Sequence, residues 1–493
     1  MNKKTELFLI IGFGQIGASI KDRLLNYKKL NDNFDICIYD THKFDNYYNN
    51  HLLDEKFTIV NKLESSIDFT KYQNINIIVC IDTNKHQTFF ESKNKSISST
   101  LLGLFFTEKH LQNEDTQVNI IIESTVPAGT AEQFQHKIIK QNCLKNYFIF
   151  SSPERYQEVY RVTELYYSTN ASEEYNLNPA TQIGIHNHSS TKIIGVCDPE
   201  GIFEETLTPY GRIETYIKSW ESSGIKFKFA NNSNEAELTK LLENHLRYIQ
   251  LSTANLFELY LKDTDLRIDK NLIRELIGTK EQTKIVPGLI GGGCIPVDSN
   301  YLYAKDLMQT QDNFPKELMN ESIEICHKIN NRMFRDTFVN LINLIKVNLA
   351  KAKRTNQEFE FYMLGLGYKK NSPTIKNSKG SELIEDVLKE FEDTNFNLDK
   401  LFLIDNCVDD YNRSYKYTPN YIEKQLKNLL PFEEFLKEID QKNQNNQIDQ
   451  NPTKVKLIII NNDNDFIYND KKYKYSTFLD EYNIPYYNIG DLK

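Results

Sequence analysis

One cysteine stands at the end of a run of glycines. Residues 291–298 read Gly-Gly-Gly-Cys-Ile-Pro-Val-Asp, so Cys294 follows three glycines and shortly precedes Asp298. A thiolate is a strong nucleophile, and a covalent intermediate divides a difficult reaction into easier steps. An isolated cysteine is more often a small buried residue, but glycines beside it leave the sulfur accessible to a substrate. The pattern therefore favours Cys294 as a covalent catalyst.

A second set of candidate groups lies on a long predicted helix. Residues 235–261 carry Leu and Ile at helical spacing and contain neither Gly nor Pro. Lys240 and Asn244 are four residues apart and so share one face of this helix. An ammonium and an amide aimed at one reacting carbon can stabilise an oxyanion. Taken alone, Lys240 would be interpreted as a solvated side chain of an amphipathic helix.

The amino-terminal region contains a glycine motif typical of dinucleotide binding. Gly12, Gly14 and Gly17 follow a predicted strand and open a predicted helix, which permits a tight turn and close approach of a pyrophosphate. Asp40 ends the next predicted strand, where a carboxylate accepts hydrogen bonds from ribose hydroxyls and repels a 2′-phosphate. The alternative is an ordinary strand-to-helix turn with an incidental aspartate. The motif in this context predicts NAD binding.

Short apolar runs alternate with helical stretches at both ends of the chain. This alternation predicts βαβ units and parallel sheets, whereas residues 229–350 are mainly helical around a glycine-rich loop at 286–298. We expect an α/β fold with two Rossmann-like doubly wound domains, joined by a helical middle domain with a long central helix. The expected boundaries are 1–228, 229–350 and 351–493. The expected strands are 7–11, 34–40, 75–81, 118–124, 147–152, 191–198, 360–367, 400–406 and 455–463.

Composition excludes several classes of protein. The 493 residues carry 59 basic and 68 acidic side chains, a formal charge of −9, which argues against a nucleic-acid binder. Seven scattered cysteines without a CxxC pair suggest neither zinc nor disulfides, and His186 and His188 are interpreted as loop histidines, so no metal is expected. No apolar run is long enough to span a membrane, and residues 1–14 lead into the glycine motif rather than a cleavage site. A cytoplasmic protein is expected.

Further segments fall in one particular order along the chain. They are Ser124-Thr125-Val126-Pro127 with Gly129-Thr130, Ser152-Pro153-Glu154-Arg155, the helix segment 237–244, the cysteine loop, and Leu364-Gly365-Leu366-Gly367-Tyr368-Lys369. Together with residues 12–17, they resemble the UDP-glucose/GDP-mannose dehydrogenase family over nearly the whole chain.

The resemblance implies that a sugar CH₂OH is oxidised through an aldehyde to a carboxylate, with about two NAD consumed. Cys294 would attack the aldehyde, and oxidation of the resulting thiohemiacetal would leave a thioester for water to hydrolyse. Lys240 would stabilise the oxyanion, with Asn244 beside it. Three further roles come from matching positions: Asp298 near the catalytic water and the lysine, Glu154 in thioester hydrolysis, and Thr125 in ordering the water.

The resemblance also implies binding residues. Those for NAD are Gly12, Phe13, Gly14, Gln15, Ile16, Gly17, Asp40, Thr83 and Thr125. Those for the nucleotide sugar are Glu154, Arg155, Lys240, Asn244, Arg247, Gly292, Lys369 and Lys376. The long helix resembles the dimer-forming helix of the family, so a homodimer is expected, and the implied role is synthesis of uronic acids for a surface polysaccharide.

The substrate and the third domain depart from the commonest pattern. Ser-Pro-Glu-Arg with Cys-Ile-Pro-Val-Asp resembles the branch acting on UDP-N-acetylhexosamines, whereas UDP-glucose and GDP-mannose enzymes usually carry Pro-Glu-Phe-Leu. Lys376 stands where the family has an arginine, and a lysine lacks the bidentate fork of a guanidinium. Residues 156–190 form an insertion. Two alternatives stay open: a hydroxyacid dehydrogenase, which needs no thiolate, and a degenerate homologue that binds without turnover.

Overall fold

The computed structural model divides into two units, each described by itself. Unit 1 comprises residues 1–158, 175–244 and 297–316, and unit 2 comprises residues 159–174, 245–296 and 317–493. The predicted domain boundaries stay a prediction. The residues that the structure describes are 6–12, 15–40, 58–60, 67–81, 111, 115–136, 146–155, 191–197, 209–264, 267–279, 287–292, 294–303, 313–368, 370, 375, 377–392, 401–405, 435–436, 454–462, 465–468, 471–481 and 484–489.

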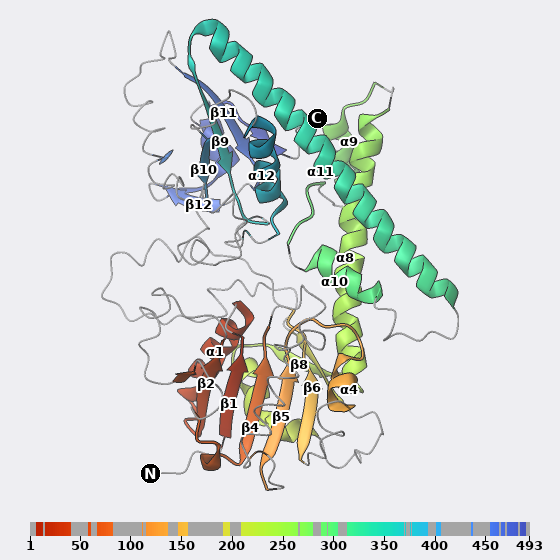
Figure 1. Ribbon diagram of the computed structural model, residues 1–493, viewed down its shortest axis with the longest axis vertical. Coiled ribbons are helices and arrows are strands. Elements are labelled where there is room, and N and C mark those ends of the chain that lie inside the picture. Colours follow the sequence, from red (N-terminus) through yellow and green to blue (C-terminus); the bar gives the residue numbers. More distant parts are fainter. Residues whose placement is uncertain are drawn as a thin grey trace. The chain divides into compact units, whose positions relative to one another are not determined.

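Unit 1 is built on a sheet with the strand order β3-β2-β1-β4-β5-β6-β7-β8 among its described residues (Figure 1). Neighbouring strands are parallel except for β6 and β7, which pair antiparallel. The strands are β1 (Glu6–Ile11), β2 (Phe34–Tyr39), β3 (Thr58–Val60), β4 (Asn74–Val79), β5 (Gln117–Ile122), β6 (Tyr147–Ser151), β7 (Thr191–Val196) and β8 (Lys226–Phe229).

Alternate residues of the central strands enter two different cores. Leu7, Leu9 and Ile11 of β1 belong to one buried cluster, and Phe8 and Ile10 belong to another. Successive side chains of a strand point to opposite faces of the sheet, so both faces are covered. After their first residues, β1, β4 and β5 are therefore mostly apolar rather than alternating, with Asn76 of β4 and Asn119 of β5 as buried polar exceptions.

Helices cover both faces of this sheet. Ile20 and Leu24 of α1 and Tyr216 and Trp220 of α7 pack in one cluster, whereas α4 contributes to the other. The helical elements of unit 1 are α1 (Gln15–Lys28), η1 (Phe69–Lys71), α4 (Thr130–Phe134), η5 (Pro209–Ile213), α7 (Glu214–Glu221), α10 (Ile295–Asp298 in part), η7 (Ser299–Tyr303) and the first residues of α8 (Ser233–Lys262).

Unit 2 contains a second parallel sheet, with the order β10-β9-β11-β14. Helices α11 and α12 pack on one core, and α16 packs on the other, so this sheet is also doubly wound. The elements of unit 2 are α9 (Lys270–Gly278), α11 (Asn313–Thr355), β9 (Glu358–Leu364), α12 (Lys379–Glu392), β10 (Leu401–Ile404), β11 (Lys454–Ile460), β12 (Asp465–Tyr468), β13 (Lys471–Lys474), α16 (Tyr475–Glu481) and β14 (Tyr487–Asn488), with the later part of α8.

The predicted fold class is confirmed: two doubly wound α/β sheets and long helices between them in the chain order. The predicted central helix 235–261 is α8, which extends from Ser233 to Lys262. One local prediction was wrong, since residues 295–298 of the expected loop form the helical turn α10. Proline is compatible with the first turn of a helix because its missing N–H has no partner there. Among the described residues, no helix is long and apolar enough to cross a membrane.

Candidate active site

The turn after β1 packs tightly at its two described glycines. Gly12 has a φ of +92°, and a Cβ there would lie 2.6 Å from the carbonyl oxygen of Cys80. A Cβ on Gly17 would lie 2.1 Å from the carbonyl oxygen of Gly12, so this helix and strand pack more closely than any side chain allows. Asp40 directly follows β2, as predicted. Gln15 opens α1, while Phe13, Gly14 and Thr83 lie outside the described residues.

Thr125 lies in the turn between β5 and α4, and a buried carboxylate from α8 holds this turn. Glu237 accepts hydrogen bonds from the backbone N–H groups of Gly129 (2.7 Å) and Ala131 (3.1 Å). It also accepts one from the Ser151 hydroxyl (2.6 Å). Glu237 is fully buried, and burial raises its pKa to about 7. The start of α8 is thereby fixed to the Thr125 turn and to the end of β6.

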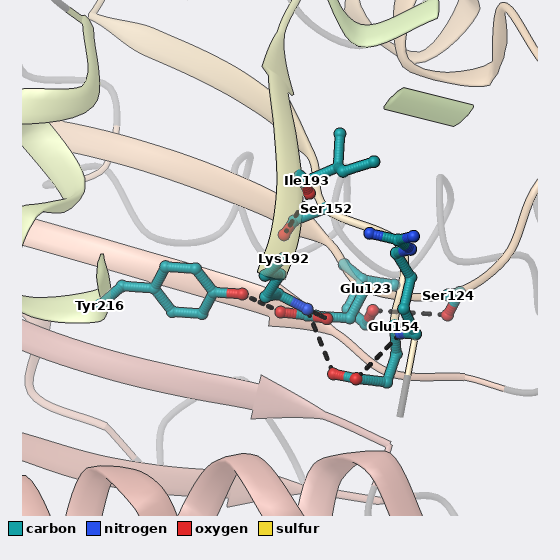
Figure 2. A network of polar contacts seen from close by, with 9 residues as sticks. Glu123, Ser124, Ser152, Glu154, Lys192, Ile193 and Tyr216 are labelled. Atoms are coloured by element: carbon teal, nitrogen blue, oxygen red, sulfur yellow. Dashed lines mark hydrogen bonds and ion pairs between the residues drawn. The ribbon is translucent and has the colours of Figure 1, made fainter. Parts of the chain in front are cut away.

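Glu154 lies just after β6, within a buried ionic network (Figure 2). The Lys192 ammonium, from β7, is 3.1 Å from one Glu154 oxygen and 2.6 Å from Glu123. The other Glu154 oxygen accepts the backbone N–H of Arg155 at 2.9 Å. Burial alone would raise the pKa of Glu154, but Lys192 and Arg23 outweigh it and hold that pKa below its usual value. Glu154 is therefore an oriented carboxylate.

Arg155 is engaged within unit 1. Its guanidinium donates to both carboxylate oxygens of Glu243 on α8, one of these bonds measuring 2.9 Å. It also donates to the carbonyl oxygen of Thr191 at 3.1 Å. These contacts tie the segment after β6 to α8 and β7, so the guanidinium has a structural role whatever else it binds.

Lys240 and Asn244 lie one turn apart on α8, as predicted. The Asn244 amide donates to the carboxylate of Asp298, which is buried at the end of α10. No hydrogen bond or ion pair of Lys240 occurs with the part of the chain that the structure describes. Asn244 and Asp298 are thus in direct contact, a pairing that the sequence did not predict.

Cys294 is the exposed one among the five cysteines that the structure describes, the others being buried. The segment 287–292 before it is held by two asparagines. The Asn255 side chain donates to and accepts from the backbone of Gly288, both at 2.8 Å. Asn330 on α11 does the same with Ile290, at 2.9 and 3.1 Å. Each side-chain amide replaces a backbone partner, so an irregular loop is fixed without a strand.

Two glycines of this loop are required by its packing in unit 2. Gly292 has a φ of +87°, and a Cβ there would lie 2.6 Å from the ring of Tyr368. A Cβ on Gly291 would lie 2.7 Å from the carbonyl oxygen of Asn377. Gly292 also donates its N–H to that oxygen at 2.8 Å. Of the predicted sugar-binding residues, Arg247 lies on α8, whereas Lys369 and Lys376 are outside the described residues.

Sequence reasoning missed the residues that surround the predicted ones. Lys192, Glu123 and Arg23 were not singled out, and Asn255 and Asn330 were not either. For Lys192 and Glu123 a signal was available, because a charged residue inside or directly after an apolar strand is rarely buried without a partner. Within the described residues, no group of three or more His, Cys, Asp or Glu side chains is placed to hold a metal ion.

The described parts of the candidate site include a tight glycine turn beside a doubly wound sheet in one unit and a glycine-rich loop ending on an exposed cysteine in the other. The family profile described as "UDP-glucose/GDP-mannose dehydrogenase family, central domain" matches residues 234–331. The resemblance to nucleotide-sugar dehydrogenases that was predicted from the sequence is confirmed.

Relatives extend the match beyond the central domain. Protein CapL of Staphylococcus aureus is 26% identical over 392 residues, covering 78% of this chain and 79% of that one. A UDP-N-acetyl-D-mannosamine dehydrogenase of Pyrococcus horikoshii is 27% identical over 279 residues, 55% of each chain.

Solved structures share the fold. A UDP-D-ManNAc dehydrogenase structure from P. horikoshii has a TM-score of 0.55 at 18% identity, covering 98% of this chain and 99% of that one. The UDP-N-acetyl-mannosamine dehydrogenase Cap5O of S. aureus has a TM-score of 0.54 at 15% identity, covering 99% of both chains.

Proposed function

We propose that this protein is an NAD-dependent nucleotide-sugar 6-dehydrogenase that oxidises a UDP-N-acetylhexosamine to its uronic acid. The observation that carries the proposal is the exposed Cys294 at the end of a glycine loop clamped by Asn255 and Asn330. A cysteine with only a structural role needs neither solvent exposure nor a fixed loop that presents its sulfur to a substrate. This observation also disfavours the hydroxyacid dehydrogenase alternative, which requires no thiolate.

The amino-terminal turn fits NAD. A cradle formed by Gly12 and Gly17, in which a Cβ has no room, leaves backbone N–H groups open to a pyrophosphate at the start of α1. Asp40 follows β2 at the position of a ribose-binding acid. NAD, when bound there, accepts a hydride in each oxidation. Phe13, Gly14, Gln15, Ile16, Thr83 and Thr125 complete the proposed cofactor-binding set.

In the proposed mechanism, the Cys294 thiolate attacks the aldehyde carbon formed in the first oxidation. The Lys240 ammonium stabilises the oxyanion, and Asn244 orients the Asp298 carboxylate through their hydrogen bond. The attack needs an accessible sulfur, and Cys294 is exposed. Asp298 is assigned a position near the catalytic water and Lys240.

Hydrolysis of the thioester needs a base and an ordered water. Glu154 is held as a carboxylate by Lys192, and we assign it the removal of a proton from that water. Thr125, in the turn that Glu237 fixes, helps to order the water. The remaining proposed sugar-binding residues are Arg155, Arg247, Gly292, Lys369 and Lys376.

The choice of sugar rests on the relatives and on two short motifs. The P. horikoshii relative is named a UDP-N-acetyl-D-mannosamine dehydrogenase, and two others are named UDP-N-acetyl-D-glucosamine 6-dehydrogenases. Residues 152–155 and 294–298 carry the motifs of the same branch. UDP-glucose and GDP-mannose are the alternative substrates, and a degenerate homologue without turnover is the alternative of another class.

The test is reduction of NAD by purified protein with UDP-N-acetylmannosamine, UDP-N-acetylglucosamine, UDP-glucose or GDP-mannose supplied separately. We expect about two NADH per molecule of an N-acetylhexosamine nucleotide, and a carboxylate product in the mass spectrum. Turnover only of UDP-glucose or GDP-mannose would move the protein to another branch. No NADH with any of the four, from a protein that binds NAD, would establish the degenerate homologue.

We further propose a cytoplasmic homodimer, formed through α8, that supplies uronic acids for a surface polysaccharide. Large apolar side chains are exposed along this helix at helical spacing, namely Leu242, Leu246, Ile249, Leu256, Phe257 and Tyr260. An exposed apolar stripe of this length usually marks an interface. Light scattering should give about twice the 57.8 kDa mass of the chain. A monomer mass at micromolar concentration would contradict the dimer.

A further inference from the structure

Lys192 lies between two buried carboxylates, of which only Glu154 has a role in the proposed mechanism. Its ammonium contacts Glu123 at 2.6 Å and Glu154 at 3.1 Å (Figure 2). The side chains of Lys192 and Glu123 are 2% and 0% exposed, and that of Glu154 is 9% exposed. An ion pair this deeply buried is costly to desolvate and is weak evidence for stability. Its position beside Glu154 suggests a functional reason.

A second cation completes the charge balance. Arg23 on α1 is 1% exposed, and its side-chain nitrogens have no hydrogen-bond partner among the described residues. The guanidinium of Arg23 and the ammonium of Lys192 each lie 4.2 Å from the ring centroid of Trp220, where a cation is attracted to the aromatic face. The cluster therefore contains two buried cations and two buried carboxylates, and both carboxylates contact Lys192.

The two carboxylates are not equivalent. Glu123 also accepts a hydrogen bond from the Tyr216 hydroxyl, and burial raises the pKa of Glu123 to about 8. Lys192 and Arg23 outweigh the effect of burial at Glu154 and lower its pKa. Glu123 is thus the member that takes up a proton near neutral pH, and Glu154 stays charged. The titratable and charged groups around Glu154 in the described chain are Arg23 from α1, Cys80 after β4, Glu123 after β5, Lys192 from β7 and, through Glu123, Tyr216 from α7.

We propose that Lys192 is the positioning residue that fixes the Glu154 carboxylate for hydrolysis of the thioester. This rests on the proposed function, in which Glu154 acts on the water. Lys192 holds one oxygen of Glu154 while the Arg155 backbone holds the other, so the carboxylate has one orientation. The ammonium also keeps Glu154 deprotonated, as a base must be.

Substitutions of Lys192 test whether its charge holds Glu154 as the base. In Lys192→Met the acidic limb of the kcat–pH profile moves to higher pH, and kcat at neutral pH falls about tenfold or more. Lys192→Arg retains a cation and should recover part of the loss. In Glu123→Gln the limb should stay near its wild-type pH, because Glu123 is already protonated where Glu154 titrates. A structural role alone would not make the limb follow the charge at position 192.

Slow hydrolysis has a second, direct signature. In Lys192→Met the thioester should accumulate, giving a burst of about two NADH per active site and a covalent sugar adduct on Cys294 detectable by mass spectrometry. In Lys192→Met one cation faces two carboxyl groups, which could impair folding. The double variant Lys192→Met/Glu123→Gln removes one ionisable group of each sign and is therefore measured as a companion variant. The double variant should fold, keep the raised acidic limb and form the adduct.

The outcomes separate the inference from the function on which it rests. If the wild type forms no NADH, the proposed function fails. If the wild type turns over but the folded double variant has the wild-type pH profile and no adduct, Lys192 does not position Glu154. If Glu123→Gln shifts the acidic limb by about one unit or more, Glu123 is charged where Glu154 titrates, and Lys192 does not act on Glu154 alone.

Discussion

Cys294→Ser should form no carboxylate product. A serine hydroxyl at ordinary pH is a far weaker nucleophile than a thiolate, so acid formation should fall by about 10³-fold or more, the scale seen when a covalent nucleophile is removed. The first oxidation does not need the sulfur, so up to one NADH per bound sugar can still appear. Product analysis by mass spectrometry, together with NADH absorbance in a single turnover, separates the two steps.

The matched control is a cysteine elsewhere in the same protein. Cys37 is buried in β2, so Cys37→Ala should lower stability by about 1 kcal/mol and retain acid formation. Iodoacetamide should inactivate the wild type and Cys37→Ala at similar rates, since Cys294 is exposed and Cys37 is buried. Full acid formation by Cys294→Ser would rule out the thioester mechanism.

Glu237→Ala should destabilise unit 1 by about 3–5 kcal/mol, because it leaves two backbone N–H groups and one hydroxyl buried without an acceptor. Those donors are on Gly129, Ala131 and Ser151. Trp220 is the one tryptophan of the chain and lies in a core of unit 1, so its fluorescence during urea unfolding reports this unit. The control Glu235→Gln changes an exposed acid on the first turn of the same helix and should cost about 1 kcal/mol or less.

The same carboxyl group predicts a pH dependence with a definite sign. Burial raises the pKa of Glu237 from 4.5 to about 7, so the folded state keeps a proton that the unfolded state releases. The free energy of unfolding of unit 1 should therefore fall as pH rises from about 4.5 to about 7. Glu237→Gln should weaken this fall relative to the wild type. An unchanged slope between about pH 5 and pH 8, or a Glu237→Ala variant as stable as the control, would contradict the role of Glu237.

The sequence determined the strands of the cores because burial on both faces leaves a local pattern. LFLII is apolar at every position, and INIIV and VNIII are apolar except for Asn76 and Asn119. These segments form β1, β4 and β5. β3 and β8 were not predicted, since β3 has three residues and β8 is the mostly exposed segment Lys226–Phe229. A short or solvated edge strand buries too little apolar surface to stand out in a sequence.

Cys294 and its glycines were also evident from the sequence, because their residue types and spacing are local. The tertiary structure decided what holds them: Asn255 and Asn330, which are 33 and 40 residues from the loop positions that they bind. It likewise decided that Lys192 faces Glu154, 38 residues earlier, and that Glu237 holds a turn more than 100 residues before it. The sequence carries the reactive groups, because chemistry depends on residue type. Only folding brings distant side chains into hydrogen-bond range and, by burying them, fixes their orientation and charge.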